Sequence, residues 1–295
     1  MHDRLLGQAR ASGRPFAELL QYFSMERFLY RLSRSSHASR FVLKGALMLV
    51  AWEAPPSRST RDIDLLGMIE NSVEAVTSAV RDICETPVEP DGLAFHAESI
   101  KGRRITEDAD YAGVRVTFVG TLGRARVPMQ IDVGFGDVVL PQAAVLDYPT
   151  MLDFPAPHLA GYSRESSIAE KFQAMVKLGP LNSRMNDFYD VWFLSREFDF
   201  AGPVLAEAIT TTFATRHTPL APAASLFLAT FASDPARATQ WKAFLARSSL
   251  AGIPDTFQQV MAAVAAFLQP LVDVVAVGQG FTRNWRAPGP WQPPD

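Results

Sequence analysis

The stretch Phe41-Val-Leu-Lys-Gly-Ala46, followed by Arg58-Ser-Thr-Arg-Asp-Ile-Asp-Leu-Leu66, decides the fold of this chain. It predicts an apolar strand that ends at Lys44-Gly45, a connection, and a second strand that carries two carboxylates. Side chains alternate between the faces of a strand, so Asp62 and Asp64 share one face. Mg²⁺ prefers oxygen ligands and is usually held by one or two carboxylates together with phosphates. The pattern therefore predicts a Mg²⁺ site at this pair.

The residues around the pair strengthen this interpretation. Most Asp-x-Asp pairs are solvated turn residues or helix caps, and this is the alternative for the pair taken alone. Like charges on one strand face, however, repel each other unless a cation lies between them. Gly45 permits unusual dihedral angles and a close approach to the backbone, which suits a phosphate lying against the main chain. Together the two segments indicate a functional site.

The composition is that of a soluble globular protein. The chain has 295 residues, of which 48% are hydrophobic and 20% are charged, enough for one large domain or two ordinary ones. The net charge of −3 argues against a basic field over the whole molecule, although a local basic patch remains possible. The single cysteine, Cys84, excludes an intramolecular disulfide and a cysteine-based zinc site, and we expect it to pack in the core.

The sequence contains no clear membrane segment. The N-terminus lacks the hydrophobic region of a signal peptide, and no uninterrupted apolar run reaches the ~18 residues of a membrane span. The stretch 260–277 comes closest, but Gln269, Pro270 and Asp273 interrupt it. We therefore expect a cytoplasmic protein without a membrane partner.

Hydrophobic periodicity and turn residues predict an α+β chain with an α/β-type N-terminal half and a helical C-terminal half. The predicted domains are 1–160 and 161–295. The predicted strands are 41–43 and 62–68, with a hairpin formed by 114–119 and 124–133 around a turn at 120–123. The predicted helices are 3–36, 46–52, 71–84, 167–177, 184–196, 203–215, 222–233, 235–248 and 255–275, and an irregular proline-rich tail covers 286–295.

Further carboxylates lie on two of these elements. Asp132 stands between Ile131 and Val133 in an apolar strand, and a buried carboxylate costs several kcal/mol unless it is paired or bound to a metal. An exposed strand face is the alternative. Asp187 and Asp190 share one face of the helix 184–196 because they are three residues apart. Arg184 has the same spacing to Asp187, so an ordinary ion pair is the alternative for those two.

These segments, in this order, resemble the AbiEii/AbiGii toxin family of nucleotidyltransferases, which includes the MenT toxins. The resemblance covers nearly the whole chain. Each motif is weak alone, and the specificity comes from five motifs in sequence. They are Phe41-Val-Leu-Lys-Gly-Ala46, Arg58-Ser-Thr-Arg-Asp-Ile-Asp64, Ile131-Asp-Val133, Ala169-Glu-Lys171 and Asn186-Asp-Phe-Tyr-Asp-Val-Trp-Phe-Leu194.

The resemblance implies a polymerase-β-like nucleotidyltransferase fold that uses Mg²⁺ and a nucleoside triphosphate. It implies that Asp62, Asp64 and Asp132 hold the metal, and that Asp132 can also accept the proton of the attacking hydroxyl. Lys171 matches the lysine that contacts the nucleotide phosphates, and Asp190 matches the downstream catalytic aspartate. The remaining nucleotide-binding positions are Lys44, Gly45, Ala46, Arg58, Thr60 and Asp187.

Two of these positions need a comment. Thr60 stands at a hydroxyl position that some family members occupy with serine and can phosphorylate. Ala46 departs from the usual glycine or serine after Lys-Gly, so it offers no hydroxyl to a phosphate. The Pro55-Pro56 pair lies in the loop before the carboxylate strand, and we expect the path of this loop to differ from that in other family members.

The resemblance further implies a toxin of a toxin–antitoxin system that adds nucleotides to the 3′ acceptor end of tRNA, with a cognate antitoxin encoded nearby. One alternative keeps the fold but places the acceptor in a protein or a small molecule. Another is a non-catalytic binding or antitoxin-like module. Five basic residues form a candidate phosphate-contacting patch, for which ordinary surface charge is the alternative: Lys101, Arg103, Arg104, Arg124 and Arg126.

Overall fold

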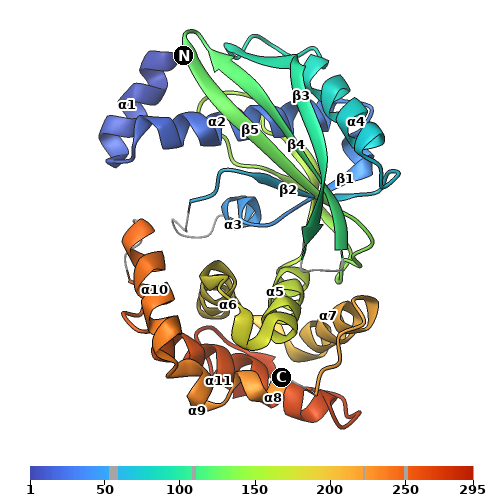
Figure 1. Ribbon diagram of the computed structural model, residues 1–295, viewed down its shortest axis with the longest axis vertical. Coiled ribbons are helices and arrows are strands. Elements are labelled where there is room, and N and C mark those ends of the chain that lie inside the picture. Colours follow the sequence, from blue (N-terminus) through green and yellow to red (C-terminus); the bar gives the residue numbers. More distant parts are fainter. Residues whose placement is uncertain (53–58, 108–110, 222, 249–251, 295) are drawn as a thin grey trace. The chain divides into compact units, whose positions relative to one another are not determined.

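The computed structural model describes residues 1–52, 59–107, 111–221, 223–248 and 252–294. They form two compact units, drawn together in Figure 1. The N-terminal unit comprises residues 1–136 and 144–161, and the helical unit comprises residues 137–143 and 162–295.

A seven-stranded mixed sheet forms the N-terminal unit, with the order β3-β4-β5-β2-β1-β7-β6. Strand β2 is antiparallel to β1 and parallel to β5, so the two segments quoted first lie side by side at the centre of the sheet. The elements are α1 (His2–Ser12), α2 (Phe16–Arg34), η1 (Ala38–Arg40), β1 (Phe41–Lys44), α3 (Leu47–Ala51), β2 (Ile63–Gly67), α4 (Val73–Glu85), β3 (Leu93–Glu107), β4 (Tyr111–Leu122), β5 (Ala125–Gly134), β6 (Ala144–Asp147) and β7 (His158–Gly161).

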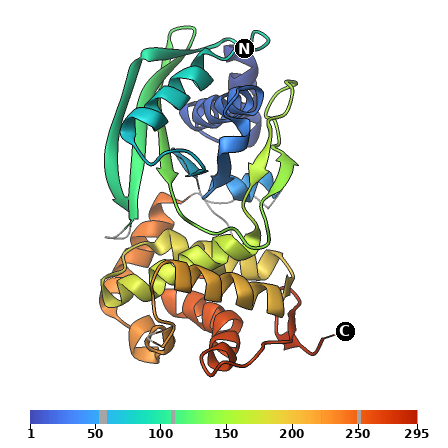
Figure 2. The ribbon, with the colours of Figure 1, turned by 90° about the vertical axis from the view of Figure 1, so that its right-hand side faces the viewer.

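One face of this sheet is apolar and is covered by α2 and α4 (Figures 1 and 2). Ile63 is paired with Ile131 and is fully buried. On the same face, Phe118 of β4 contacts Phe28 of α2, with ring centroids 5.7 Å apart. Since side chains alternate along a strand, the carboxylates that flank Ile63 lie on the opposite face.

A buried ion network anchors α2 to the loop before β3. Arg31 contacts both carboxylate oxygens of Asp91 at 2.6 and 3.1 Å, and Arg27 Nε lies 3.5 Å from the same carboxylate. The side chain of Asp91 is only 2% exposed. Burial strengthens these contacts, and it makes the loss of either partner costly.

The N-terminal unit differs from the sequence prediction in three places, one of which is the pair of strands β6 and β7, which were not predicted. The predicted helix 3–36 is two helices, because Gly13 ends α1 at a φ of 68° and Pro15 caps α2. Strand β3 was not predicted. A register shift between His96 and Lys101, where five steps along β3 match two along β4, breaks its alternation. An odd number of extra residues moves the following side chains to the other face of the sheet.

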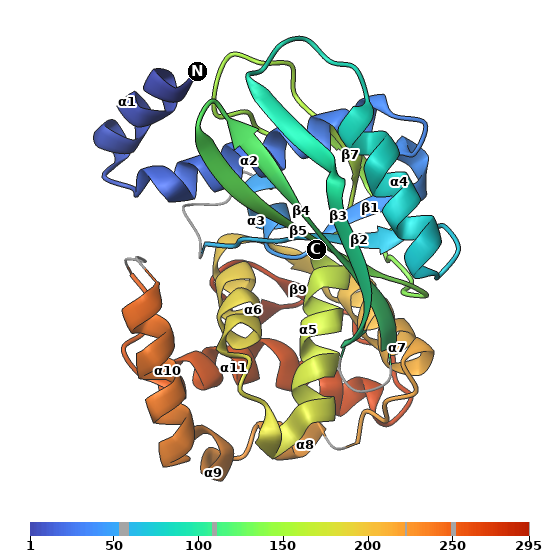
Figure 3. The ribbon, with the colours of Figure 1, turned by 45° about the horizontal axis from the view of Figure 1, so that its top comes forward.

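The helical unit is built on α5 and α6, which pack against α7 and α11 (Figure 3). Phe172 of α5 meets Phe213 of α7 at 5.3 Å, and Phe188 of α6 meets Phe257 of α11 at 5.1 Å. The predicted helices are confirmed, except that 222–233 holds two short helices. The elements are α5 (Arg164–Leu178), η2 (Gly179–Leu181), α6 (Met185–Glu197), β8 (Phe200–Ala201), α7 (Gly202–Thr215), α8 (Ala223–Leu226), α9 (Ala229–Ala232), α10 (Pro235–Arg247), α11 (Phe257–Val275), β9 (Asn284–Trp285) and β10 (Trp291–Gln292).

The prediction of an irregular tail over 286–295 holds for most of its described residues, but Trp291–Gln292 form a short strand. Strands β8, β9 and β10 form a small antiparallel sheet, and Trp285 and Trp291 are buried against Phe267 of α11. The Trp285 indole N–H donates to the Ser195 carbonyl at 2.6 Å. The aromatic surface buried here stabilises a segment whose prolines suggest only turns.

Among the described helices, α11 is the one long and apolar enough to cross a bilayer. The core helix of a soluble protein passes the same test. Val264, Phe267 and Leu268 are fully buried within the unit, so the length and composition of α11 are weak grounds for a membrane span.

Candidate active site

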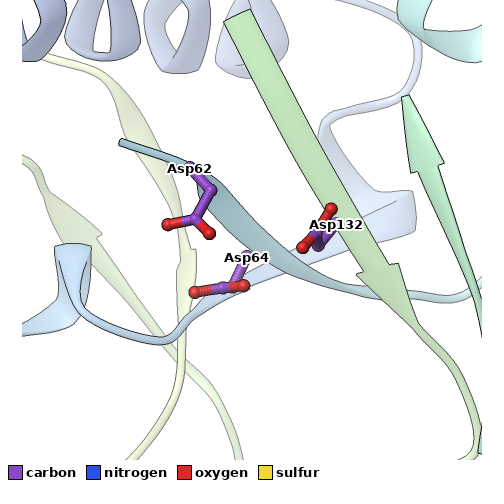
Figure 4. Close-up of side chains that lie close together, drawn as sticks. All are labelled: Asp62, Asp64 and Asp132. Atoms are coloured by element: carbon purple, nitrogen blue, oxygen red, sulfur yellow. The ribbon is translucent and has the colours of Figure 1, made fainter. Parts of the chain in front are cut away.

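Three aspartates converge on the polar face of the central strands (Figure 4). Asp62 directly precedes β2, Asp64 lies within it, and Asp132 is the partner of Asp64 on β5. Each offers a carboxylate oxygen, and these oxygens lie within 4.8 Å of one another. Asp132 is 6% exposed, which confirms its predicted burial, and the other two are half-buried. We call these three residues the triad.

Gly45 makes room for one member of the triad. A Cβ at this position would lie 2.0 Å from Asp64 Oδ2, and the φ of Gly45 is 72°. The sequence predicts a phosphate against this backbone, whereas the structure places the Asp64 carboxylate there. Glycine is required for two reasons. Other residues rarely adopt this φ, and their Cβ would collide with Asp64 Oδ2. Lys44 of β1 is also buried, and it is the cross-strand partner of Asp64 in the register of β1 and β2.

Arg115 of β4 holds Asp132 with two hydrogen bonds. Its Nε donates to Oδ1 at 2.7 Å and its Nη2 donates to Oδ2 at 2.6 Å. These bonds, and the charges of the triad, raise the pKa of Arg115. Sequence reasoning missed this residue, although the hairpin register contains the signal. A two-residue turn at Gly123-Arg124 places Arg115 opposite Asp132.

Hydrogen bonds from uncharged side chains orient the rest of the triad. Thr60 Oγ1 donates to Asp62 Oδ1 at 2.5 Å, and the Thr60 backbone N–H donates to Tyr22 Oη at 3.1 Å. Gln130 Nε2 lies 3.5 Å from Asp62 Oδ2 and 3.3 Å from Asp132 Oδ2. Neither Tyr22 nor Gln130 stands out in the sequence, because each becomes informative only beside the triad.

The donor set fits a hard divalent cation. Three carboxylates carry three negative charges, and the cations beside them are Arg115 and Lys44, so the negative charge is in excess. Each carboxylate oxygen has two acceptor positions, so the oxygens that already accept hydrogen bonds can still bind a metal. Clustered carboxylates with excess negative charge are the arrangement that Mg²⁺, Mn²⁺ or Ca²⁺ prefers.

A second group of predicted site residues lies in the helical unit. Lys171 of α5 places its Nζ 2.7 Å from Asp190 Oδ2 and 3.4 Å from Asp187 Oδ1, both on α6. Arg184 Nε is 2.7 Å from Asp187 Oδ2, which confirms the ion pair that the spacing suggests. Asp190 is 1% exposed. The two carboxylates therefore fix the position of the Lys171 side chain within this unit.

The remaining predicted residues are placed as follows. Ala46 is buried directly before α3, and Arg58 lies outside the described residues. Of the five basic residues, Arg104 donates to Asn71. Lys101, Arg103, Arg124 and Arg126 form no ion pair with a carboxylate among the described residues. Arg103 is the cross-strand partner of Arg115.

A family model described as the nucleotidyl transferase AbiEii toxin of type IV toxin–antitoxin systems matches residues 27–263. The chain belongs to this family. It is therefore a nucleotidyltransferase of the toxin–antitoxin class, and the alternative of a non-catalytic module is disfavoured. Membership in a toxin–antitoxin family implies a cognate antitoxin.

At the level of the fold, the chain is similar to a solved structure. A crystal structure of a protein from H. pylori, provisionally described as a nucleotidyltransferase, has a TM-score of 0.50 and 14% identity, covering 90% of this chain and 98% of that chain. JHP933 from Helicobacter pylori has a TM-score of 0.47 and 13% identity, covering 84% and 88%. No curated protein matches the sequence.

Proposed function

We propose that this AbiEii nucleotidyltransferase uses Mg²⁺ to transfer a nucleotide from a nucleoside triphosphate to the 3′ acceptor end of tRNA. The product cannot be aminoacylated, so translation stops in the cytoplasm until the antitoxin restrains the enzyme. The observation that supports this proposal is the triad, which occurs in a chain of a nucleotidyltransferase family.

In this proposal Asp62, Asp64 and Asp132 hold the metal. When bound, Mg²⁺ neutralises the negative charge that develops on the triphosphate. The acceptor's 3′-hydroxyl attacks the α-phosphorus, a new P–O bond forms, and the bond to the leaving pyrophosphate breaks. Asp132 accepts the hydroxyl proton, and Arg115 holds this carboxylate in position.

The other predicted residues act on the triphosphate. Lys171, held in position by Asp190 and Asp187, contacts its β- or γ-phosphate. Lys44 and Ala46, at the end of β1, contribute to the phosphate site, and Gly45 serves it by leaving room for the Asp64 carboxylate. Thr60 orients Asp62 through its hydroxyl hydrogen bond, and its phosphorylation would remove that donor and add negative charge beside the triad.

The first prediction tests the triad directly. Purified protein is incubated with total tRNA, Mg²⁺ and each labelled nucleoside triphosphate in turn, and the products are separated on a gel. We expect one or more nucleotides to label tRNA. Asp62→Asn should reduce the rate at least 10³-fold, because it removes a metal-binding charge while keeping the side-chain shape.

Asp147→Asn is the matched control, since this aspartate is exposed and pairs with His158 on β6 and β7. It should retain the wild-type rate. Wild-type transfer by Asp62→Asn would refute the triad as the catalytic centre. Labelling of a protein or a small molecule in place of tRNA would refute the acceptor assignment while leaving the chemistry intact.

A further inference from the structure

A cavity of about 410 Å³ lies beside the triad in the N-terminal unit. It is bounded by the start of α2, the segment before β2, and the first residues of β5. Pro15 and Leu20 of α2 and Val127 and Pro128 of β5 form an apolar wall, and Arg61 and Arg126 add two cations. The volume falls within the range of small-ligand sites. We call this cavity the α2–β5 pocket.

The walls of the α2–β5 pocket are tied together by hydrogen bonds. Gln21 Nε2 of α2 donates to the Arg61 carbonyl at 3.3 Å and to the Pro128 carbonyl at 3.2 Å. Thr60 lines the pocket, and its backbone is held by Tyr22. The pocket is therefore formed before any ligand arrives, which lowers the entropic cost of binding.

The charge of the pocket favours an anion. Glu18 lines it too, but Arg14 pairs with this carboxylate at 2.9 Å. Arg61 and Arg126 are exposed, and neither forms an ion pair with a carboxylate in the described parts of the chain. Two free guanidinium groups beside an apolar wall suit a ligand that has both phosphate and a flat apolar surface, which is the chemistry of a nucleotide.

The position of the pocket distinguishes an acceptor strand from the donor. Thr60 belongs to the pocket and donates to Asp62, so the pocket adjoins the triad. Arg126, however, precedes Asp132 by six residues on β5, which corresponds to ~20 Å. The three phosphates of a donor bound at the triad cannot reach that far. A strand with repeated phosphates can contact both places.

We propose that the α2–β5 pocket binds the single-stranded 3′ end of the acceptor RNA, with a base against the apolar wall and backbone phosphates on Arg61 and Arg126. This inference rests on the proposed function, and it adds where the acceptor lies. A single strand is required, because a cavity of this size admits one nucleotide and excludes a base pair.

The test measures RNA binding without catalysis. Binding of a fluorescein-labelled single-stranded RNA of about 12 nucleotides ending in CCA is followed by anisotropy in EDTA at several salt concentrations. Arg61→Ala and Arg126→Ala should each weaken binding about tenfold and reduce the salt slope by about 0.7, the value for one lost phosphate contact on a single strand. A blunt RNA duplex should bind the wild type and these variants equally.

Two matched controls separate the pocket from general surface charge. Arg124→Ala removes an exposed arginine two residues away that does not line the pocket, and it should leave binding unchanged. Ala17→Phe fills the pocket without changing its charge and should weaken binding, whereas Ala11→Phe on exposed α1 surface should not.

The outcomes also separate this inference from the proposed function. Three outcomes would overturn the assignment of the α2–β5 pocket to the acceptor RNA. They are equal losses for Arg124→Ala and Arg126→Ala, wild-type binding by all the pocket variants, and no RNA binding by the wild type. A higher KM for the triphosphate with unchanged RNA binding would assign the pocket to the donor and also overturn it. Failure of the wild type to label any RNA, despite pocket-dependent binding, would overturn only the proposed function.

Discussion

At the scale of single residues, the site depends on how closely side chains approach one another. Asp64 reaches the triad because Gly45 leaves space for its carboxylate. Arg115 then fixes Asp132 with two short hydrogen bonds. These contacts set the position of the ligand oxygens before a metal binds, which reduces the cost of assembling the site.

Gly45→Ala should disable this arrangement. The substitution imposes an unfavourable φ, at a cost of about 1–2 kcal/mol, and its Cβ displaces the Asp64 carboxylate. We expect nucleotide transfer to fall by more than tenfold, as measured with labelled triphosphate. Gly123→Ala is the control, because Gly123 also has a positive φ, of 58°, but open space around it. Equal losses for both variants would show that backbone strain, and not the collision, is the cause.

Cys84 provides a residue-scale test of packing. Burial raises the pKa of its thiol to about 12, against an ordinary value of about 8.5. At pH 8 the buried thiol of the folded protein is protonated and shielded, so the native protein should resist alkylation by iodoacetamide and react rapidly in urea. Fast labelling of native protein would contradict the burial.

The same shift has a consequence for stability. Because the folded-state pKa of Cys84 is raised, its contribution to stability is fully present below the thiol's ordinary pKa. That contribution should decline as the pH rises from about 9 towards 12. Comparison of urea unfolding for the wild type and Cys84→Ser across this range measures it.

At the scale of elements, the ion network of α2 determines how firmly the helix is held on the sheet. Asp91 neutralises Arg31 and lies near Arg27 in a buried position. Asp91→Ala should reduce the free energy of unfolding by about 3–5 kcal/mol, because it leaves the buried Arg31 guanidinium without its carboxylate partner. Urea denaturation measures this loss.

Asp153→Ala is the matched control for that measurement. Asp153 pairs with Arg4 at 2.6 Å, but its side chain is 95% exposed. Exposed ion pairs contribute at most about 1 kcal/mol, so this variant should unfold close to the wild type. A loss at Asp153 as large as the loss at Asp91 would show that burial does not determine the strength of these pairs.

At the scale of the whole molecule, metal binding should be visible as stability. A ligand that binds only the folded state at a hundred times its Kd adds about 2.7 kcal/mol. Mg²⁺ should therefore raise the Tm by roughly 5 °C, and EDTA should reverse the effect. Asp132→Asn should remove this shift, and it should raise the metal-free Tm because it relieves repulsion within the triad.

Asp147→Asn again serves as the control, and it should show the full Mg²⁺-dependent shift. A shift of equal size in Asp132→Asn would place the metal elsewhere on the protein. A metal-free Tm below that of the wild type would indicate that the Arg115–Asp132 contact stabilises the fold more than repulsion destabilises it.

Several features of this protein are determined by local sequence. The sequence pattern predicts strands over 41–43 and 62–68 and places Asp62 and Asp64 on one face, and both strands are found. Helical periodicity predicts α4, α5 and α6, and the apolar neighbours of Asp132 predict its burial. Each of these depends on the geometry of consecutive residues, which a strand or a helix repeats in every protein.

Other features were decided by the tertiary structure. The Arg115–Asp132 contact requires the hairpin register, and the α2–β5 pocket requires three distant segments to meet. The C-terminal strands are stabilised by the packing of Trp285 and Trp291 against Phe267. The bulge in β3 hides its strand from any pattern of period two. The physical reason is the same in each case: these contacts depend on how separate elements pair and pack, and local alternation contains no information about which partner a side chain will meet.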